Sequence, residues 1–285
     1  MARPCATRAC SPHSSRTCRS ERRTVSESIF VERDGRFAPT DHARGPWDPM
    51  ALHGGAPAAL ITEAFRREQP GDQLPIARLC FELLRPVPFA PLELSVATLR
   101  HGRRVQELSA ELHCEGALIC RASALRVQPV PDGLQVEGGP PLERPMPGPQ
   151  EATPVDFALD DAAHASFASA MEMRWLDDPD ARGPARVWMR PRLELVPGAP
   201  LSPLARLAAA ADFGNGVSAA LPFDRYIFIN ADLSIHLRRE PRGEWIGLDA
   251  RTLLHGGGTG LAESVLHDTD GPLGRALQTL IVQPR

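Results

Sequence analysis

The stretch LHGGAPAALITEAF, residues 52–65, decides the fold of this chain. Two glycines follow His53 and lead into a run rich in alanine, leucine and isoleucine, with Pro57 near its start. Proline suits the first turn of a helix because the N–H that it lacks would have no partner there. The stretch therefore predicts a helix over residues 55–67.

The residues just before this helix are candidates for substrate binding. Gly54 and Gly55 let the backbone approach another group closely, because they carry no side chain. Free N–H groups at a helix N-terminus, together with the helix dipole, favour an anion or a polarised carbonyl oxygen. We therefore select His53, Gly54 and Gly55 as substrate-binding candidates. The alternative is an ordinary helix start that contains glycine.

The composition limits the classes of protein to consider. The chain has 285 residues, of which 42% are hydrophobic, and this is enough for two cores of ordinary size. Its formal net charge of -3 argues against a nucleic-acid-binding protein, which normally has a basic excess. No stretch is long and apolar enough to span a bilayer. We expect a cytoplasmic protein.

The first 24 residues are rich in arginine and serine and contain no apolar run of the kind found in a signal peptide. Such a composition cannot bury enough apolar surface to offset the entropy of ordering. We therefore expect residues 1–24 to be a disordered tail.

The rest of the chain repeats one plan of a helix followed by several strands. Residues 76–129 and 229–284 both divide into strands separated by turns at proline and glycine. A second helix is expected over residues 202–212, with Ser202 as its N-cap. A segment dense in proline and glycine, residues 131–160, separates the copies as a linker. The predicted domains are residues 25–130 and 161–285.

This pattern resembles the hotdog fold, in which an antiparallel sheet wraps a central helix. Two copies in tandem, the first beginning with His53-Gly54-Gly55, are similar to the double-hotdog enzymes of the acyl-CoA thioesterase II family. The resemblance covers roughly residues 26–285 and implies an α+β tandem hotdog. It also implies hydrolysis of acyl-CoA to a fatty acid and coenzyme A, with no metal or cofactor, by a monomer or a homodimer.

Comparison of the two copies suggests where the chemistry lies. In the first strand after each helix, we match an apolar face in the first copy with a polar face in the second; the two sets are Ala77, Leu79, Phe81 and Leu83, and Asn230, Asp232, Ser234 and His236. Unpaired burial would cost such polar groups about 1–3 kcal/mol each, so a wet cleft is one explanation. The alternative is that this face is simply exposed to solvent.

In the thioesterase II family, an Asp at the helix end, a Thr or Ser early in the next strand and a Gln in the final strand hold the attacking water. The resemblance assigns these catalytic roles to Asp212, Asn230 and Gln278, with Gln278 matched to Ser123 of the first copy. Asn230 departs from the family pattern because an amide has no rotatable hydroxyl donor. Ser234, on the same predicted face, is a further substrate-binding candidate.

Two other functions stay open. Hotdog enoyl-CoA hydratases use an Asp and a His that are spaced like Asp48 and His53, although the Asn-Pro pair that normally precedes that His is missing here. A non-catalytic protein that binds acyl-CoA is the second alternative, and Asn230 is the residue that suggests it. The HGGG motif at residues 255–258 is not part of an α/β-hydrolase, because no G-x-S-x-G motif accompanies it.

Overall fold

The computed structural model describes residue 1 and residues 27–68, 74–130, 146–155 and 165–285. Apart from residue 1, the predicted tail of residues 1–24 lies outside the described residues, as does most of the predicted linker. The described part of the linker, residues 146–155, contacts the second half of the chain. There the Trp188 Nε1–H donates to the Pro147 carbonyl oxygen at 2.8 Å.

Helices are few and short. They are α1 Gly55–Arg67, α2 Pro203–Ala211, the four-residue α3 Gly214–Val217 and a 3-10 turn, η1 Asp41–Ala43. Helices are present at both predicted places, and the Ser202 Oγ caps α2 by accepting a hydrogen bond from the Ala205 N–H at 3.2 Å. None of the described helices has the length and apolar character needed to cross a membrane.

Most of the described chain is β-sheet. The first half contributes β1 Phe30–Arg33, β2 Arg36–Pro39, β3 Ile76–Leu83, β4 Leu92–His101, β5 Val105–Cys114 and β6 Ala117–Val127. The second half contributes β7 Thr153–Pro154, β8 Met171–Trp175, β9 Ala185–Pro191, β10 Tyr226–Asn230, β11 Asp232–Leu237, β12 Ile246–His255, β13 Thr259–Asp268 and β14 Gly271–Pro284.

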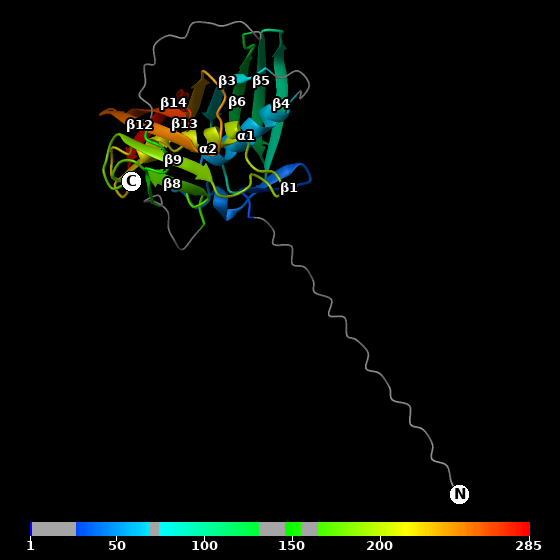
Figure 1. Cartoon of the computed structure of the whole chain (residues 1–285), viewed down its shortest axis with the longest axis horizontal. Helices are drawn as coiled ribbons and strands as arrows, with labels where there is room; N and C mark the ends of the chain where they lie inside the picture. Colours follow the sequence, from blue (N-terminus) through cyan, green and yellow to red (C-terminus); the bar gives the residue numbers. More distant parts are fainter. Residues whose placement is uncertain (2–26, 69–73, 131–145, 156–164) are drawn as a thin grey trace.

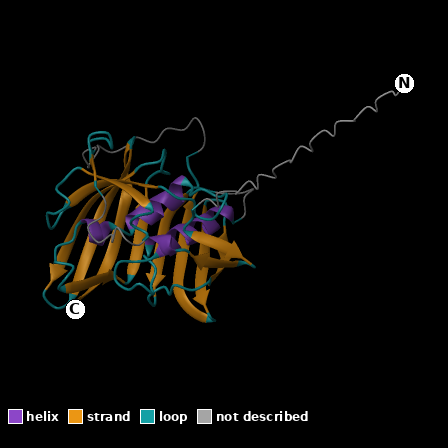
Figure 2. Cartoon of the chain, turned by 90° about the horizontal axis from the view of Figure 1, so that it is seen from below, coloured by secondary structure: helices purple, strands orange, loops and turns teal. Residues whose placement is uncertain are grey.

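These strands form one antiparallel sheet in the order β1-β2-β4-β5-β6-β3-β11-β14-β13-β12-β9-β8-β7, and β10 pairs with β14. The strand order is symmetric about the central β3–β11 pair. From the centre outward, β6, β5 and β4 follow β3 on one side, and β14, β13 and β12 follow β11 on the other. In Figure 1, α1 and α2 lie in the middle of the molecule, between the strands of the two halves. Figure 2 shows the helices gathered against the strands.

The two main helices pack against each other in opposite directions. Gly54, at the start of α1, lies against Asp212 at the end of α2. At the other end of the pair, Glu63 of α1 lies near Ser202, which begins α2. Both helices are largely buried, and they join a continuous apolar core that contains residues of both halves. The helix pair therefore brings groups from the two copies together at each of its ends.

Strand register corrects the predicted match between a polar and an apolar face. In the central pair, Leu79 lies opposite Ile235 and Phe81 lies opposite Leu233, and all four side chains are buried. The apolar face of β3 therefore continues into an apolar face of β11. The predicted match of this apolar face with the polar residues of the segment 230–236 is therefore wrong. The predicted alignment of the two strands is displaced by one residue, and a displacement of one residue exchanges the two faces of a strand.

The register also moves the counterpart of Gln278 by one residue. Gln278 is buried, and its counterpart in β6 is the fully buried Ala124. The predicted counterpart, Ser123, corresponds instead to Leu277. One copy thus has a buried amide where the other has a methyl group.

Gly55→Ala is expected to destabilise the fold where the helices cross. A Cβ at Gly55 would lie 2.6 Å from the Ala209 carbonyl oxygen and 2.7 Å from Cε1 of Phe167. Overpacking of this kind costs about 1–3 kcal/mol. Thermal unfolding should show a lower Tm, by about 2–4 °C per kcal/mol.

The matched control for this change is Gly256→Ala. A Cβ at Gly256 would have no heavy atom within 4 Å, and its φ is not positive. Both substitutions reduce the entropy of the unfolded chain in the same way, so their difference reports the contact at the helix crossing. Equal Tm values for the two variants would contradict close packing at Gly55.

Candidate active site

A buried carboxylate marks one end of the helix pair. Asp212 directly follows four alanines of α2, as its C-cap residue, and is only 4% exposed. Its Oδ2 lies where a side chain on Gly54 would be, since a Cβ there would come within 2.7 Å. Gly54 is therefore needed for the carboxylate to approach the start of α1. A charged group this deeply buried requires partners.

Two side-chain amides supply those partners. The Asn230 Nδ2–H donates to Asp212 Oδ1 at 2.8 Å. The Gln278 Nε2–H donates to the Asp212 carbonyl oxygen at 3.1 Å, with Oδ1 of the same residue 3.4 Å away. Gln278 is fixed in turn, because its Oε1 accepts the Asn215 N–H at 3.0 Å. The structure thus brings Asp212, Asn230 and Gln278 into one hydrogen-bonded cluster.

Asn230 reaches this cluster because the strand changes register after it. Asn230 ends β10 opposite Leu280, whereas Ser234 in β11 lies opposite Leu277. The one-residue shift falls at Ala231, between the two strands, and such a shift turns the following side chains to the other face. Asn230 therefore points to Asp212 although it does not belong to the regular alternation of β11.

Ser234 does not join the cluster. It lies opposite Cys80 in the central strand pair, on the face away from the buried Leu233 and Ile235. Its neighbour on that face, Asp232, accepts the backbone N–H of Thr279 at 2.7 Å. The predicted site role of Ser234 gains no contact from the fold, because strand alternation directs its side chain away from the helices.

His53 completes the cluster from the first half of the chain. Its ring packs against two buried rings that also contact each other, with centroids 4.9 Å from Phe167 and 4.3 Å from Phe213. Its Nδ1 lies 3.0 Å from Asp212 Oδ2 and also 3.0 Å from the Gly55 nitrogen. Without a proton, Nδ1 accepts the Gly55 N–H, and with a proton it donates to Asp212. The position of one proton therefore selects the partner of His53.

The glycines have more specific positions than the sequence predicts. The Gly55 N–H, a predicted donor to a substrate oxygen, is directed to His53 Nδ1. Gly54 makes room for Asp212. Both glycines lie at the cluster, and in this structure they position its side chains.

The histidine and aspartate of the hydratase alternative are not brought together. Asp48 is exposed and its Oδ1 accepts the Met50 N–H at 2.8 Å, so it stabilises a turn. The carboxylate that contacts His53 is that of Asp212.

The sequence interpretation missed several supporting residues. They include the two rings around His53, Phe167 and Phe213, and the Asn215 backbone that holds Gln278. Gly214 also serves the site, because a Cβ there would come within 2.9 Å of Gln278 Oε1. The FGNG sequence after Asp212 was the available signal, since two glycines at a helix end indicate close packing of the backbone.

Comparison with protein families gives two matches along the chain. Residues 43–127 match the profile of the acyl-CoA thioesterase N-terminal domain, and residues 143–282 match that of the acyl-CoA thioesterase C-terminal domain. Together the two profiles span most of the chain. No curated protein matches the sequence significantly.

Solved structures resemble the whole described fold. A protein from Novosphingobium aromaticivorans assigned as a thioesterase shares 24% identity with a TM-score of 0.68, over 89% of this chain and 98% of its own. A hot dog fold protein from Alicyclobacillus acidocaldarius shares 16% with a TM-score of 0.65, over 90% and 95%. An acyl-CoA thioesterase II from Mycobacterium marinum shares 18% with a TM-score of 0.57, over 82% and 90%. At these identities the likeness shows a hotdog fold.

Proposed function

This chain belongs to the acyl-CoA thioesterase family and is a thioester hydrolase, and from that premise we propose that it cleaves acyl-CoA by direct attack of water. The observation that carries the proposal is the buried Asp212 carboxylate, held by the amides of Asn230 and Gln278. The products are a free fatty acid and coenzyme A. The chain length of the acyl group is not part of the proposal.

In the proposed mechanism, Asp212 orients a water molecule and accepts one of its protons as the oxygen attacks the thioester carbonyl carbon. The C–S bond then breaks, and the proton passes to the sulfur that leaves with coenzyme A. Water reaches the cluster from the side of Asn230, which is only partly buried, whereas Asp212 and Gln278 are nearly inaccessible. The N-terminal end of α1 favours the negative charge that develops on the carbonyl oxygen.

His53 is a positioning residue in this mechanism. Because it contacts Asp212 Oδ2 while both amides are directed to Oδ1, it fixes the second oxygen of the carboxylate. The contacts with the buried rings of Phe167 and Phe213 restrict the orientation of the imidazole.

We also propose that the chain is a tandem hotdog with domains 25–130 and 161–285. Three observations support this arrangement: the symmetric strand order about the β3–β11 pair, the antiparallel helices α1 and α2, and the match to separate N- and C-terminal domains. The cluster then combines groups of both copies, since His53 belongs to the first and Asp212 to the second.

The direct test is to incubate the purified full chain with acyl-CoA esters of graded chain length. Hydrolysis is measured as release of the coenzyme A thiol. Saturable release identifies a thioesterase. Acyl-CoA binding without release would instead favour the non-catalytic alternative. A change in enoyl-CoA absorbance without thiol release would favour the hydratase.

Asn230→Thr is expected to preserve kcat or raise it. A threonine hydroxyl can donate to Asp212 Oδ1 as the Asn230 amide does, and it can rotate toward water. Asn230→Ala removes the donor and should lower kcat about tenfold or more, since hydrogen bonds to charged groups contribute about 1.5–3 kcal/mol. If the threonine variant were as impaired as the alanine variant, Asn230 would not occupy the place of the family hydroxyl.

A further inference from the structure

An aromatic cluster lies beside the acid cluster, where the two halves of the chain meet. Trp47, from the loop between η1 and α1, contacts Phe223 and Phe228 of the second half, with ring centroids 5.7 Å and 5.0 Å away. Phe223 and Phe228 also contact each other, with centroids 4.9 Å apart. Phe228 is 2% exposed, whereas Trp47 and Phe223 are half-buried. The cluster therefore presents an aromatic surface that solvent still reaches.

Strand β10 connects this aromatic surface to the acid cluster. Phe228 and Asn230 occupy alternate positions of the strand, so their side chains lie on the same face, about 7 Å apart along it. The Phe228 carbonyl oxygen also accepts the Asn215 Nδ2–H at 3.1 Å, and the Asn215 backbone N–H holds Gln278. Asn230 is the partly open member of the acid cluster. The aromatic surface therefore lies on the side from which a substrate reaches Asp212.

The loop that carries Trp47 is fixed by hydrogen bonds at its base. The Gly45 N–H donates to the Ala51 carbonyl oxygen at 2.9 Å, and the His53 N–H donates to that of Ala43 at 3.0 Å. Gly45 allows this close path, since a Cβ there would lie 3.1 Å from the His53 nitrogen. Because the loop ends at His53, it fixes Trp47 relative to the acid cluster.

The chemistry of this surface suits an alkyl chain. Aromatic side chains offer a large apolar area, and methylene groups gain free energy when they are buried against it. The Trp47 indole N–H has no hydrogen-bond partner among the described residues, so no polar contact accounts for the position of the ring. The Arg285 guanidinium lies 5.8 Å from the centre of the Trp47 ring, and Arg285 is exposed.

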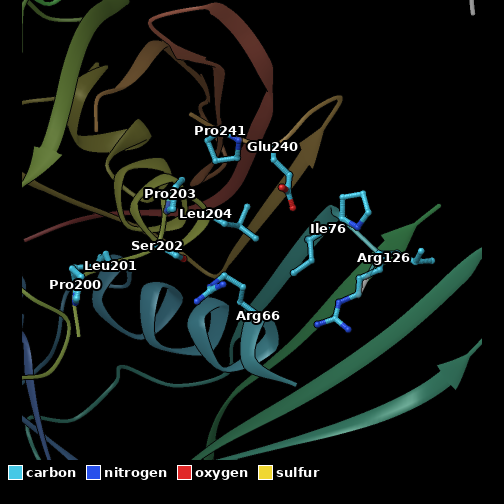
Figure 3. Close-up of a pocket in the computed structure, with 12 residues that line it drawn as sticks. Arg66, Ile76, Arg126, Pro200, Leu201, Ser202, Pro203, Leu204, Glu240 and Pro241 are labelled. Carbon is cyan, nitrogen blue, oxygen red and sulfur yellow. The ribbon is translucent and has the colours of Figure 1, made fainter. Parts of the chain in front are cut away.

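A cavity that could hold a chain lies at the other end of the helix pair. It has a volume of about 700 Å³ and lies between the end of α1 and the segment that leads into α2 (Figure 3). Helix α1 has 13 residues, so this cavity is roughly 20 Å from Asp212, at a rise of about 1.5 Å per residue. Its lining includes the charged residues Arg66 and Glu240. A chain attached to a thioester at Asp212 would have to run along two buried helices to reach it.

We propose that the acyl chain of the substrate lies along Trp47 and Phe223, so that this surface sets the preference for chain length. The inference rests on the proposed function, because it takes acyl-CoA as the ligand. A long chain covers the two half-buried rings and gains the free energy of burying its methylene groups, whereas a short chain ends before it covers them. Trp47 is thus a specificity-determining residue from the first half for a reaction centred in the second.

The test compares kcat/KM for decanoyl-CoA and butanoyl-CoA in the unaltered protein and in Trp47→Ala. The ratio of the two values should fall about tenfold in the variant, which corresponds to the lost burial of about two methylene groups. Trp47→Phe keeps an aromatic ring and should retain most of the ratio. Trp245→Ala is the matched control and should leave the ratio unchanged, because this half-buried tryptophan packs against Arg174 of β8 and Arg190 of β9.

Calorimetric titration with the non-hydrolysable thioethers S-decyl-CoA and S-butyl-CoA separates this inference from the proposed reaction. Trp47→Ala should weaken the binding of S-decyl-CoA about tenfold more than that of S-butyl-CoA, the same loss of methylene burial. If this pattern is seen but the esters release no thiol, the proposed hydrolysis fails and the binding surface stands.

Two results would overturn the proposal. An equal loss of affinity for both thioethers would place the nucleotide end of coenzyme A at Trp47 and Arg285 instead of the acyl chain. An unchanged or higher ratio of kcat/KM in folded Trp47→Ala would show that the chain does not lie on this ring. Phe223→Ala removes the neighbouring ring, carries the same expectation and tests the surface if Trp47→Ala fails to fold.

Discussion

Asp212→Asn is expected to lower kcat for acyl-CoA hydrolysis by at least about a hundredfold, the lower end of general-base contributions. The asparagine keeps the size of the side chain and one oxygen for the Asn230 amide, but it cannot accept a proton from water. Its amide would face His53 Nδ1, which can accept a hydrogen bond. The fold should therefore persist while the base is lost. Steady-state kinetics with thiol detection measures the change.

The control for this variant is Asp249→Asn, because Asp249 lies exposed on β12. It changes the net charge by the same amount and should leave kcat within about twofold of the unaltered protein. Thermal unfolding of both variants checks that a loss of activity is not caused by a loss of stability. An unchanged kcat in Asp212→Asn would remove the catalytic assignment while leaving the fold intact.

Asp268→Asn is expected to cause the largest loss of stability, about 3 kcal/mol, because it breaks a buried ion pair. Asp268 ends β13, and its fully buried carboxylate accepts two hydrogen bonds of 2.6 Å from Arg239. It also accepts the backbone N–H groups of Arg242 and Asp270. An amide oxygen and a donor NH2 cannot satisfy these four donors. The Tm at pH 7 should fall by about 6–12 °C.

The effect should depend on pH in a definite direction. Burial raises the pKa of Asp268, but the hydrogen bonds from Arg239 and the two backbone N–H groups outweigh it, so the pKa is lowered. A carboxyl group with a lowered pKa in the folded protein stabilises it fully above its unfolded pKa of about 3.9. That stabilisation is lost as the pH falls through the lower, folded value. The Tm difference between the unaltered protein and Asp268→Asn should therefore shrink toward pH 3.

Asp270→Asn is the matched control in the same turn. The Asp270 carboxylate lies 3.7 Å from Arg242, and both side chains are exposed. Exposed pairs contribute about 0–1 kcal/mol, so this variant should melt close to the unaltered protein at each pH. A Tm difference for Asp268→Asn that stays constant from pH 7 to pH 3 would contradict the assigned role of the carboxylate.

The local signals in the sequence were sufficient to place the helices and the acid. Pro57 and Ser202 mark helix starts through backbone chemistry that acts within a few residues. Asp212 was recognisable because it follows four alanines at a helix end, and the family resemblance selected Asn230 and Gln278. The structure holds these three side chains together, and their catalytic roles stay a prediction.

The faces of the strands are harder to predict, because side chains alternate between the two faces. A single extra residue in a strand therefore reverses the face of every residue after it. The register shift at Ala231 reverses the alternation after Asn230, and no residue type in that segment announces it. For this reason Ser234 was placed beside Asn230, and Gln278 was matched with Ser123 instead of Ala124.

The sequence by itself determined what depends on neighbours in the chain: two helices with their ends, a repeated plan of strands, and an acidic residue at the end of the second helix. Only the tertiary structure decided which distant groups meet. The antiparallel helix pair places His53 on Asp212 at one end, and at the other end Arg126 of β6 binds the last carbonyl oxygens of α1. Such contacts depend on how the two halves pack, because helix crossing and strand register join residues that no local pattern relates.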